Sequence, residues 1–283
     1  MSDTPIAPPV PGLPPQTEKH MFDLQANQGQ LAALAGSPPP APRWFADITR
    51  HAPESRFVMV QGARIHYLRW GDAAKPGILL VHGNAAHAYW WSFIAPFLAR
   101  DYHVAAMDLS GMGDSQWRAG GYSMELFAAE EMAVLEDAGM FTPAEPPVIV
   151  GHSFGGFVTM LTGGVYGARL KGTVIVDSPV NPPVRAHGGP PTGPSSTVPR
   201  PHNIYPSLAA ALARFRLMPP QLSKNLFLVD WVARHSLKEV ALEDGSPGFT
   251  WKFDPAIWRH FSIGDTEALL QATRCRIAIF RGE

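Results

Sequence analysis

Short apolar runs alternate with segments of helical pattern from residue 56 onward. The runs at 57–60, 65–70, 77–83, 102–108, 147–150 and 172–176 are rich in aliphatic and β-branched side chains, which is typical of strands. The runs at 77–83 and 147–150 are almost uninterrupted, as in strands buried on both faces of a mainly parallel sheet. Helical patterns at 89–100, from Ser123 onward and at 154–166 separate them. This alternation predicts a doubly wound α/β fold.

The segments before and after the alternating strands and helices indicate how the chain is divided into domains. Residues 1–43 hold ten prolines and little periodicity, so we expect a Pro-rich, flexible N-terminal arm. The α/β core is expected over 44–179. Prolines then crowd the segment that follows, and residues 206–262 have a helical pattern, so we expect 180–262 to be an inserted helical cap. Residues 263–283 are expected to return to the core through a helix and a strand.

The most specific motif is Gly151–Gly156, which follows an apolar run and opens a helical segment. A serine between glycines at a strand-to-helix junction fits a nucleophile elbow, a sharp turn that exposes the hydroxyl above the sheet. Such a turn leaves no room for β-carbons at Gly151 and Gly155, and it places the nucleophile in an unfavourable backbone region. The alternative is that Ser153 is an ordinary helix N-cap.

The composition and motifs of the chain argue against several classes of function. The net charge of −1 gives no electrostatic surface for nucleic acid or an anionic membrane. A single cysteine, Cys275, excludes an intrachain disulfide, and no P-loop, dinucleotide fingerprint or Cys/His cluster indicates a cofactor or metal. The sequence has no apolar stretch of about 18 residues and no secretory signal pattern at its start, so we expect a cytoplasmic protein. Its oligomeric state is left open.

Three motifs stand in order along the chain, each at the end of a predicted strand: 81–84 (Val-His-Gly-Asn), 108–115 (Asp-Leu-Ser-Gly-Met-Gly-Asp-Ser) and 151–155 (Gly-His-Ser-Phe-Gly). In this order they resemble the α/β-hydrolase superfamily, in its capped esterase, C–C hydrolase and cofactor-free haloperoxidase-like branches. The resemblance covers about residues 56–283. It implies an α/β-hydrolase fold, with a mostly parallel sheet flanked by helices and an inserted helical cap.

The resemblance also assigns roles. Ser153 would be the nucleophile that forms an acyl-enzyme with a small ester-like or other carbonyl substrate. The backbone amides of Asn84 and Phe154 would form the oxyanion hole, with His82 and Gly83 supporting the loop. Family members that act on epoxides or haloalkanes carry aspartate at the elbow, so serine argues against both activities.

One departure from the family concerns the catalytic acid and histidine, which should follow the serine. The predicted strand 276–280 is followed by Gly282 and the chain ends at Glu283, so we expect the last strand and helix to be missing and the activity to be impaired. Two explanations stay open, a truncated hydrolase or a complete chain with another acid and base. Asp177 is a weak candidate for the substitute acid.

Two other functions remain open. The chain could be a non-catalytic ligand-binding protein of this fold, or a cofactor-free haloperoxidase-like perhydrolase. All of these readings share a small-molecule ligand as the partner. Asp108 is expected to form a turn that packs beside the site, without a catalytic role.

Overall fold

The structure is a computed structural model, which describes residues 29–142, 145–180 and 200–282. The expectations for residues 1–28 and 181–199 therefore lie outside the described residues. The described chain divides into two compact units. One contains residues 29–40, 204–234 and 239–249, and the other contains residues 41–203, 235–238 and 250–282, with the gaps given above.

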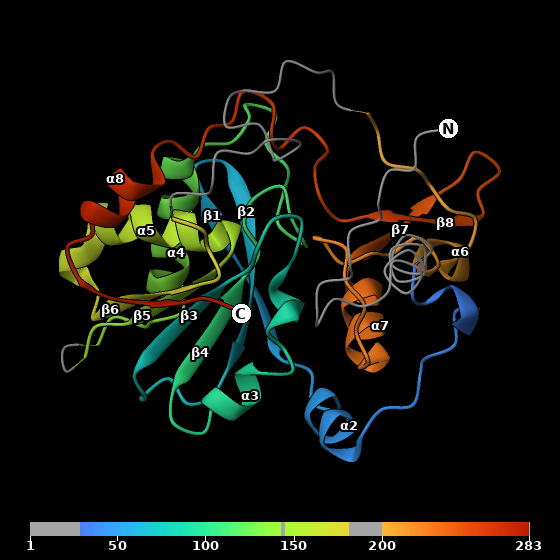
Figure 1. The fold of residues 1–283 in the computed structure, drawn as a ribbon, viewed down its shortest axis with the longest axis horizontal. Helices are drawn as coiled ribbons and strands as arrows, with labels where there is room; N and C mark the ends of the chain where they lie inside the picture. Colours follow the sequence, from blue (N-terminus) through green and yellow to red (C-terminus); the bar gives the residue numbers. More distant parts are fainter. Residues whose placement is uncertain (1–28, 143–144, 181–199, 283) are drawn as a thin grey trace, which may run out of the picture. The chain divides into compact units, whose positions relative to one another are not determined.

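The second unit is built on a seven-stranded sheet in the order β1-β2-β4-β3-β5-β6-β9 (Figure 1). The strands are β1 (Glu54–Val60), β2 (Ala63–Trp70), β3 (Gly77–Val81), β4 (His103–Met107), β5 (Val148–His152), β6 (Gly172–Val176) and β9 (Arg276–Phe280). The β1–β2 and β2–β4 pairs are antiparallel, and all other pairs are parallel. The mostly parallel sheet predicted from the alternation of apolar runs is confirmed.

Helices cover both faces of this sheet (Figure 1). One face carries α4 (Met124–Asp137) and α5 (Phe154–Tyr166), with α8 (Thr266–Gln271) packed along α5, and the other carries η2 (Ala88–Trp90) and α3 (Ala95–Leu98). In β3, Leu79 and Val81 belong to the core on the α4–α5 side, whereas Ile78 and Leu80 belong to the core on the α3 side. The uninterrupted apolar run at 77–83 thus reflects burial on both faces.

The helix expected over 89–100 is divided into η2 and α3. Pro96 stands in the first turn of α3. Proline has no N–H to donate to a preceding turn and is favoured where a helix begins. A further helix, α2 (Arg43–Thr49), precedes β1. None of the helices within the described ranges combines the length and apolar character needed to cross a membrane.

The first unit contains η1 (Ala32–Leu34), α6 (Leu208–Leu212) and most of α7 (Leu226–His235). Gln30 exchanges two hydrogen bonds with the backbone of Ser223, at 3.0 and 3.1 Å. Leu31 is buried, and Arg234 donates to the Gly36 carbonyl at 2.7 Å. Residues 29–36 are therefore packed within this unit, which differs from the flexible arm expected over 1–43.

The segment expected as a helical cap, 180–262, also contains strands. Its described part holds α6, α7 and a hairpin of β7 (Leu237–Ala241) and β8 (Pro247–Trp251). The turn of this hairpin places Gly245 at φ 81° and is closed by a 2.8 Å hydrogen bond from the Leu242 amide to the Ser246 carbonyl. Asp244 accepts from the Ser246 amide as well. A wholly helical cap is therefore a wrong expectation for residues 237–251.

Candidate active site

Ser153 stands between β5 and α5 with an unusual backbone. Its φ is 52° and its ψ is −115°. A non-glycine residue in such a region persists only when its surroundings hold it there. Two hydrogen bonds do so: the Ser153 amide donates to the Val176 carbonyl at 2.9 Å, and Ser178 Oγ donates to the Ser153 carbonyl at 2.7 Å. The strained turn expected from the motif is present.

Both glycines around Ser153 are required by close backbone contacts. A β-carbon on Gly155 would lie 2.5 Å from the His82 carbonyl oxygen. One on Gly151 would lie 2.5 Å from the Gly155 carbonyl oxygen and from Thr159 Oγ1. Contacts this short do not occur for real β-carbons, so the steric argument made from the sequence is confirmed.

The Ser153 side chain is half-buried and is not engaged by the helix that follows it. It makes no capping hydrogen bond to α5, and its hydroxyl bonds to no other residue in the described parts of the chain. Ser153 thus occupies the N-cap position of α5 without the side-chain hydrogen bond and extended backbone of an ordinary N-cap.

The loop after β3 lies against this turn. A β-carbon on Gly83 would be 3.3 Å from the Ser153 β-carbon. Asn84 is exposed, and Ala85 turns the chain with a φ of 52°. Within the described residues, neither the Asn84 amide nor the Phe154 amide donates a hydrogen bond to the protein. Two N–H groups from separate loops are thus unengaged beside the serine.

His82 joins the Gly83 loop to the loop after β4. The Leu109 amide donates to His82 Nε2 at 3.1 Å, which assigns the ring proton to Nδ1 and directs it at the Gly83 carbonyl, 2.7 Å away. Burial lowers the pKa of His82, so the ring is neutral at neutral pH. A neutral, doubly bonded imidazole fixes the loop that precedes Asn84.

Asp108 is a buried anchor for the same region. Its carboxylate accepts from His66 Nδ1 at 2.7 Å, from the Asp114 amide at 2.8 Å and from the Ala88 amide at 2.5 Å. Burial acts to raise its pKa, but the hydrogen bond and charge of His66 lower it to about 2. These contacts support the turn that was expected to pack beside the site.

His66 is a residue that the sequence reading missed. Its Nε2 accepts from the exposed Ser55 hydroxyl at 2.9 Å, so Ser55, His66 and Asp108 form a chain of hydrogen bonds. The only signal in the sequence was a histidine within an apolar strand pattern.

His66, Asp108 and Asp114 also offer metal-ligand atoms within 4.8 Å of one another, but Asp114 pairs with Lys252 at 2.7 Å and Asp108 already accepts three hydrogen bonds. The group is fully engaged in protein contacts.

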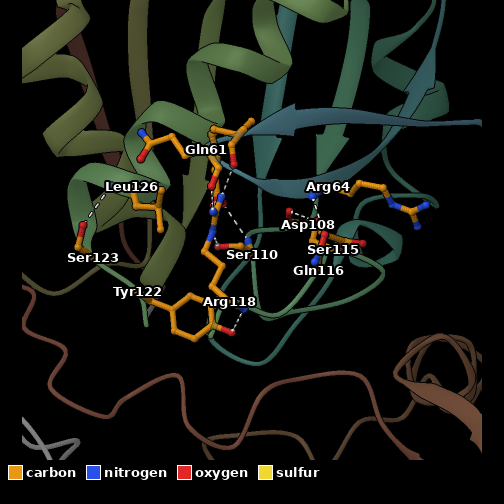
Figure 2. Close-up of polar contacts among 12 residues, drawn as sticks. Gln61, Arg64, Asp108, Ser110, Ser115, Gln116, Arg118, Tyr122, Ser123 and Leu126 are labelled. Atoms are coloured by element: carbon orange, nitrogen blue, oxygen red, sulfur yellow. Dashed lines mark hydrogen bonds and ion pairs between the residues drawn. The ribbon is translucent and has the colours of Figure 1, made fainter. Parts of the chain in front are cut away.

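The loop after Asp108 is fixed by Arg118 (Figure 2). Its guanidinium donates to Glu130 at 2.8 Å, to the Val60 and Gln61 carbonyls at 2.8 and 2.9 Å, and to Ser110 Oγ at 3.0 Å. Glu130 in turn accepts from the Ser110 amide. This network holds the loop between β4 and α4 against the β1–β2 turn.

Asp177 directly follows β6, at the same carboxyl end of the parallel strands as Ser153. Its φ is 53°, its amide donates to the Phe280 carbonyl at 2.7 Å, and its exposed carboxylate accepts from the Gly282 amide at 3.3 Å. Burial lowers the pKa of the neighbouring His152, and the Asp177 charge opposes that shift. His152 Nδ1 would lie 3.1 Å from a β-carbon on Gly83. Asp177 and His152 are therefore both close to the elbow.

Aromatic packing fixes Phe154 behind its amide. Its buried ring meets those of Trp258, Phe127 and Phe261 edge-on at 5.1, 5.6 and 5.7 Å between centroids. Edge-to-face contacts of this kind stabilise a core and define ring orientation. The side chain is thus part of the core, whereas the amide is at the turn.

Parts of this chain are similar to known proteins. The profile of the alpha/beta hydrolase family matches residues 78–273. Epoxide hydrolase 4 from Mus musculus is 28% identical over 120 residues, which is 42% of this chain and 32% of that protein. Monoacylglycerol lipase from Mycolicibacterium smegmatis is 32% identical over 144 residues, which is 48% of this chain and 49% of that protein. The chain thus matches about a third to a half of the length of these relatives.

A solved structure supports the same fold. The thioesterase domain from the curacin biosynthetic pathway superposes with a TM-score of 0.61 and 24% identity, over 81% of this chain and 82% of that domain. The family profile covers most of the chain, including β3 to β6 and the elbow. This chain therefore belongs to the alpha/beta hydrolase family.

Proposed function

We propose that this chain is a serine-dependent hydrolase of a small ester-like or other carbonyl substrate, acting through an acyl-enzyme. The supporting observation is the Ser153 turn, strained at φ 52° and free of any capping bond, beside the unengaged amides of Asn84 and Phe154. A relative named monoacylglycerol lipase, matched over 48% of this chain, agrees with an ester substrate.

The proposed reaction has two steps. In the first, Ser153 Oγ bonds to the carbonyl carbon, the bond from that carbon to the leaving group breaks, and the hydroxyl proton passes to the departing alcohol or other leaving group. The carbonyl oxygen becomes an oxyanion that accepts from the two amides, each donor contributing about 2.7–4 kcal/mol in the transition state. The N-terminus of α5 adds a positive dipole end. In the second step, water attacks the acyl-enzyme, releases the acid and restores the hydroxyl.

We also propose that turnover is slow. In the parts of the chain that the structure describes, no imidazole accepts a hydrogen bond from Ser153. A serine without an adjacent base stays protonated and is a poor nucleophile, and loss of a triad member costs about 10⁴- to 10⁶-fold in turnover. Asp177 is the proposed substitute acid, because its carboxylate follows β6 at the carboxyl end of the parallel strands, where the elbow also lies.

Epoxide hydrolysis is the other activity that the relatives' names raise. The covalent intermediate of that reaction in this family is an ester of an enzyme carboxylate, and the elbow residue here is Ser153. We therefore favour a carbonyl substrate. A perhydrolase would use the same serine and the same two amides.

The test is labelling by a fluorophosphonate, which reacts with activated serines, together with hydrolysis of p-nitrophenyl acetate. We expect slow labelling that stops at one label per chain, at Ser153, and slow hydrolysis. Ser153→Ala should abolish both, and Ser262→Ala, at an exposed serine before α8, should change neither.

Each other outcome points to a different function. Absence of labelling, with thermal stabilisation by a carbonyl ligand, would indicate a non-catalytic binding protein. Peroxide-dependent bromination that requires Ser153 would indicate a perhydrolase. Rapid hydrolysis that Ser153→Ala abolishes would contradict slow turnover while supporting the nucleophile.

A further inference from the structure

Glu131 is a fully buried carboxyl group behind the elbow. It lies on α4 and is 0% exposed. Its Oε1 accepts a hydrogen bond from Thr159 Oγ1 on α5 at 3.0 Å. Its Oε2 has no hydrogen-bond partner among the described residues, and no lysine, arginine or histidine of those residues forms an ion pair with it. A carboxyl in this position has no role in the reaction proposed above.

Thr159 connects this carboxyl to the backbone of the elbow. Its Oγ1 lies 2.5 Å from the position that a β-carbon on Gly151 would take. The Gly155 carbonyl lies equally close to the same point. Gly151 is two residues before Ser153 in β5. The Thr159 hydroxyl therefore contacts Glu131 on one side and the backbone of the elbow on the other. That backbone consists of the end of β5 and the first turn of α5, which together hold Ser153.

The surroundings of Glu131 favour its uncharged form. The hydroxyl groups of Thr159 and Thr162 on α5 act to lower the pKa of Glu131, and the charge of Glu130, which pairs with Arg118 at 2.8 Å, acts to raise it. Among the titratable groups on the packed elements, Tyr67 on β2 is bonded to Asp137 on α4, and His152 lies at the end of β5. Burial, with a smaller effect of Glu130, raises the pKa of Glu131 to about 8. The group is therefore a neutral acid at pH 7.

We propose that Glu131 is a positioning residue for Ser153, whose uncharged carboxyl supports the elbow through Thr159 and whose ionisation loosens it. The proposal rests on the proposed nucleophilic role of Ser153. An ionised carboxylate in this dry site would need water or further donors. Water or other donors can reach the carboxylate only if α4 and α5 separate. That movement withdraws the Thr159 hydroxyl from Gly151.

The first test follows the fluorophosphonate labelling rate of Ser153 from pH 6 to pH 9.5. Glu131→Gln keeps an acceptor for Thr159 and cannot ionise, so it should match the natural chain at pH 7. At pH 9 about nine tenths of Glu131 is ionised, and the natural chain should label at about a tenth of the rate of Glu131→Gln. Glu136→Gln, at an exposed carboxyl on the same helix, should follow the natural chain. Identical pH profiles for Glu131→Gln and the natural chain would overturn the proposal.

A second pair of variants tests the connection without altering the carboxyl. Thr159→Ser keeps the hydroxyl and should label at nearly the natural rate at pH 7. Thr159→Val keeps the shape and removes the hydroxyl, so labelling should fall about tenfold, comparable to a lost hydrogen bond near a buried carboxyl. Equal rates for the two variants would contradict a positioning role.

Amide hydrogen exchange gives a readout that needs no reactive serine. At pH 9 the peptide that covers residues 148–156 should exchange faster in the natural chain than in Glu131→Gln at the same pH. If no variant labels, the role of Ser153 is refuted, and this exchange difference alone then decides whether Glu131 supports the elbow. Equal exchange in the two proteins would refute it.

Discussion

At the scale of single residues, the elbow depends on the absence of a side chain at Gly155. A β-carbon there would meet the His82 and Val81 carbonyl oxygens at 2.5 and 2.9 Å, and both are backbone atoms that cannot rotate away. We expect Gly155→Ala to lower the free energy of unfolding by about 1–3 kcal/mol, as overpacking does elsewhere. Displacement of the turn should also abolish fluorophosphonate labelling of Ser153. Denaturant unfolding and labelling measure the two effects.

The matched control is Gly120→Ala. A β-carbon on Gly120 would meet nothing within 4 Å, and its backbone has no positive φ. The free energy of unfolding should therefore change by less than about 0.5 kcal/mol. If Gly155→Ala were as stable as this control, the close contact at the elbow would be refuted.

Part of this residue-level detail could be predicted from the sequence. Ser153 and its two glycines were predictable because a sharp strand-to-helix turn excludes β-carbons wherever it occurs. The groups that hold this turn in place could not be predicted from the sequence. Ser178 is 25 residues from Ser153 and Glu131 is 28 residues from Thr159, so their contacts depend on how separate elements pack. A local motif carries no information on that packing.

At the scale of elements, strands buried on both faces were the easiest to predict and the β7–β8 hairpin was missed. Leu237 and Val240 are three residues apart, which fits a helix as well as a strand. The better signal was the Asp244-Gly245 pair, because an Asp-Gly dipeptide favours the positive φ of tight hairpin turns. Gly245 indeed has a φ of 81°.

The edge strand β9 leads to a prediction about association. All five of its residues are exposed, including Ile279 at 48% and Phe280 at 60%, and among the described residues it pairs on one side only, with β6. Exposed apolar edge strands promote pairing with other chains, and a lysine on the edge opposes it. We expect Ile279→Lys to lower the weight-average mass in sedimentation at high concentration, with little effect on unfolding. Ile279→Val should associate like the natural chain, and equal association of all three proteins would exclude β9 as the contact.

At the scale of the whole molecule, the sequence indicated an arm, a core and a cap, whereas the described chain forms two units. The described end of the N-terminal segment packs with residues more than 190 positions later, as the bonds between Gln30 and Ser223 show. The prolines of residues 1–43 were an accurate sign of irregular backbone in part of that segment. They gave no sign of the long-range packing, because it depends on contacts of individual residues such as the buried Leu31, the Gln30 amide and the Gly36 carbonyl.

The acid stability of the whole fold should depend on Asp108, which joins β2, the segment before α3 and the loop after β4. Its pKa falls from 3.8 to about 2 on folding, against the effect of burial, because His66 bonds to it. A carboxyl with a lowered pKa stabilises the fold above its unfolded value, and that contribution is lost as the pH falls from about 4 towards 2. The shift corresponds to about 2 kcal/mol.

Asp108→Asn should therefore be less stable at pH 7, by at least about 2 kcal/mol, because the buried His66 loses its charged partner. Between pH 4 and pH 2 its free energy of unfolding should fall less steeply than that of the natural chain, since one titrating carboxyl has been removed. Denaturant unfolding at pH 7, 4, 3 and 2.5 measures both effects, with Asp101→Asn, at an exposed carboxylate, as the control. Parallel pH dependence in Asp108→Asn and the natural chain would show that other carboxyls set the acid limit, and that Asp108 acts only through its contacts at neutral pH.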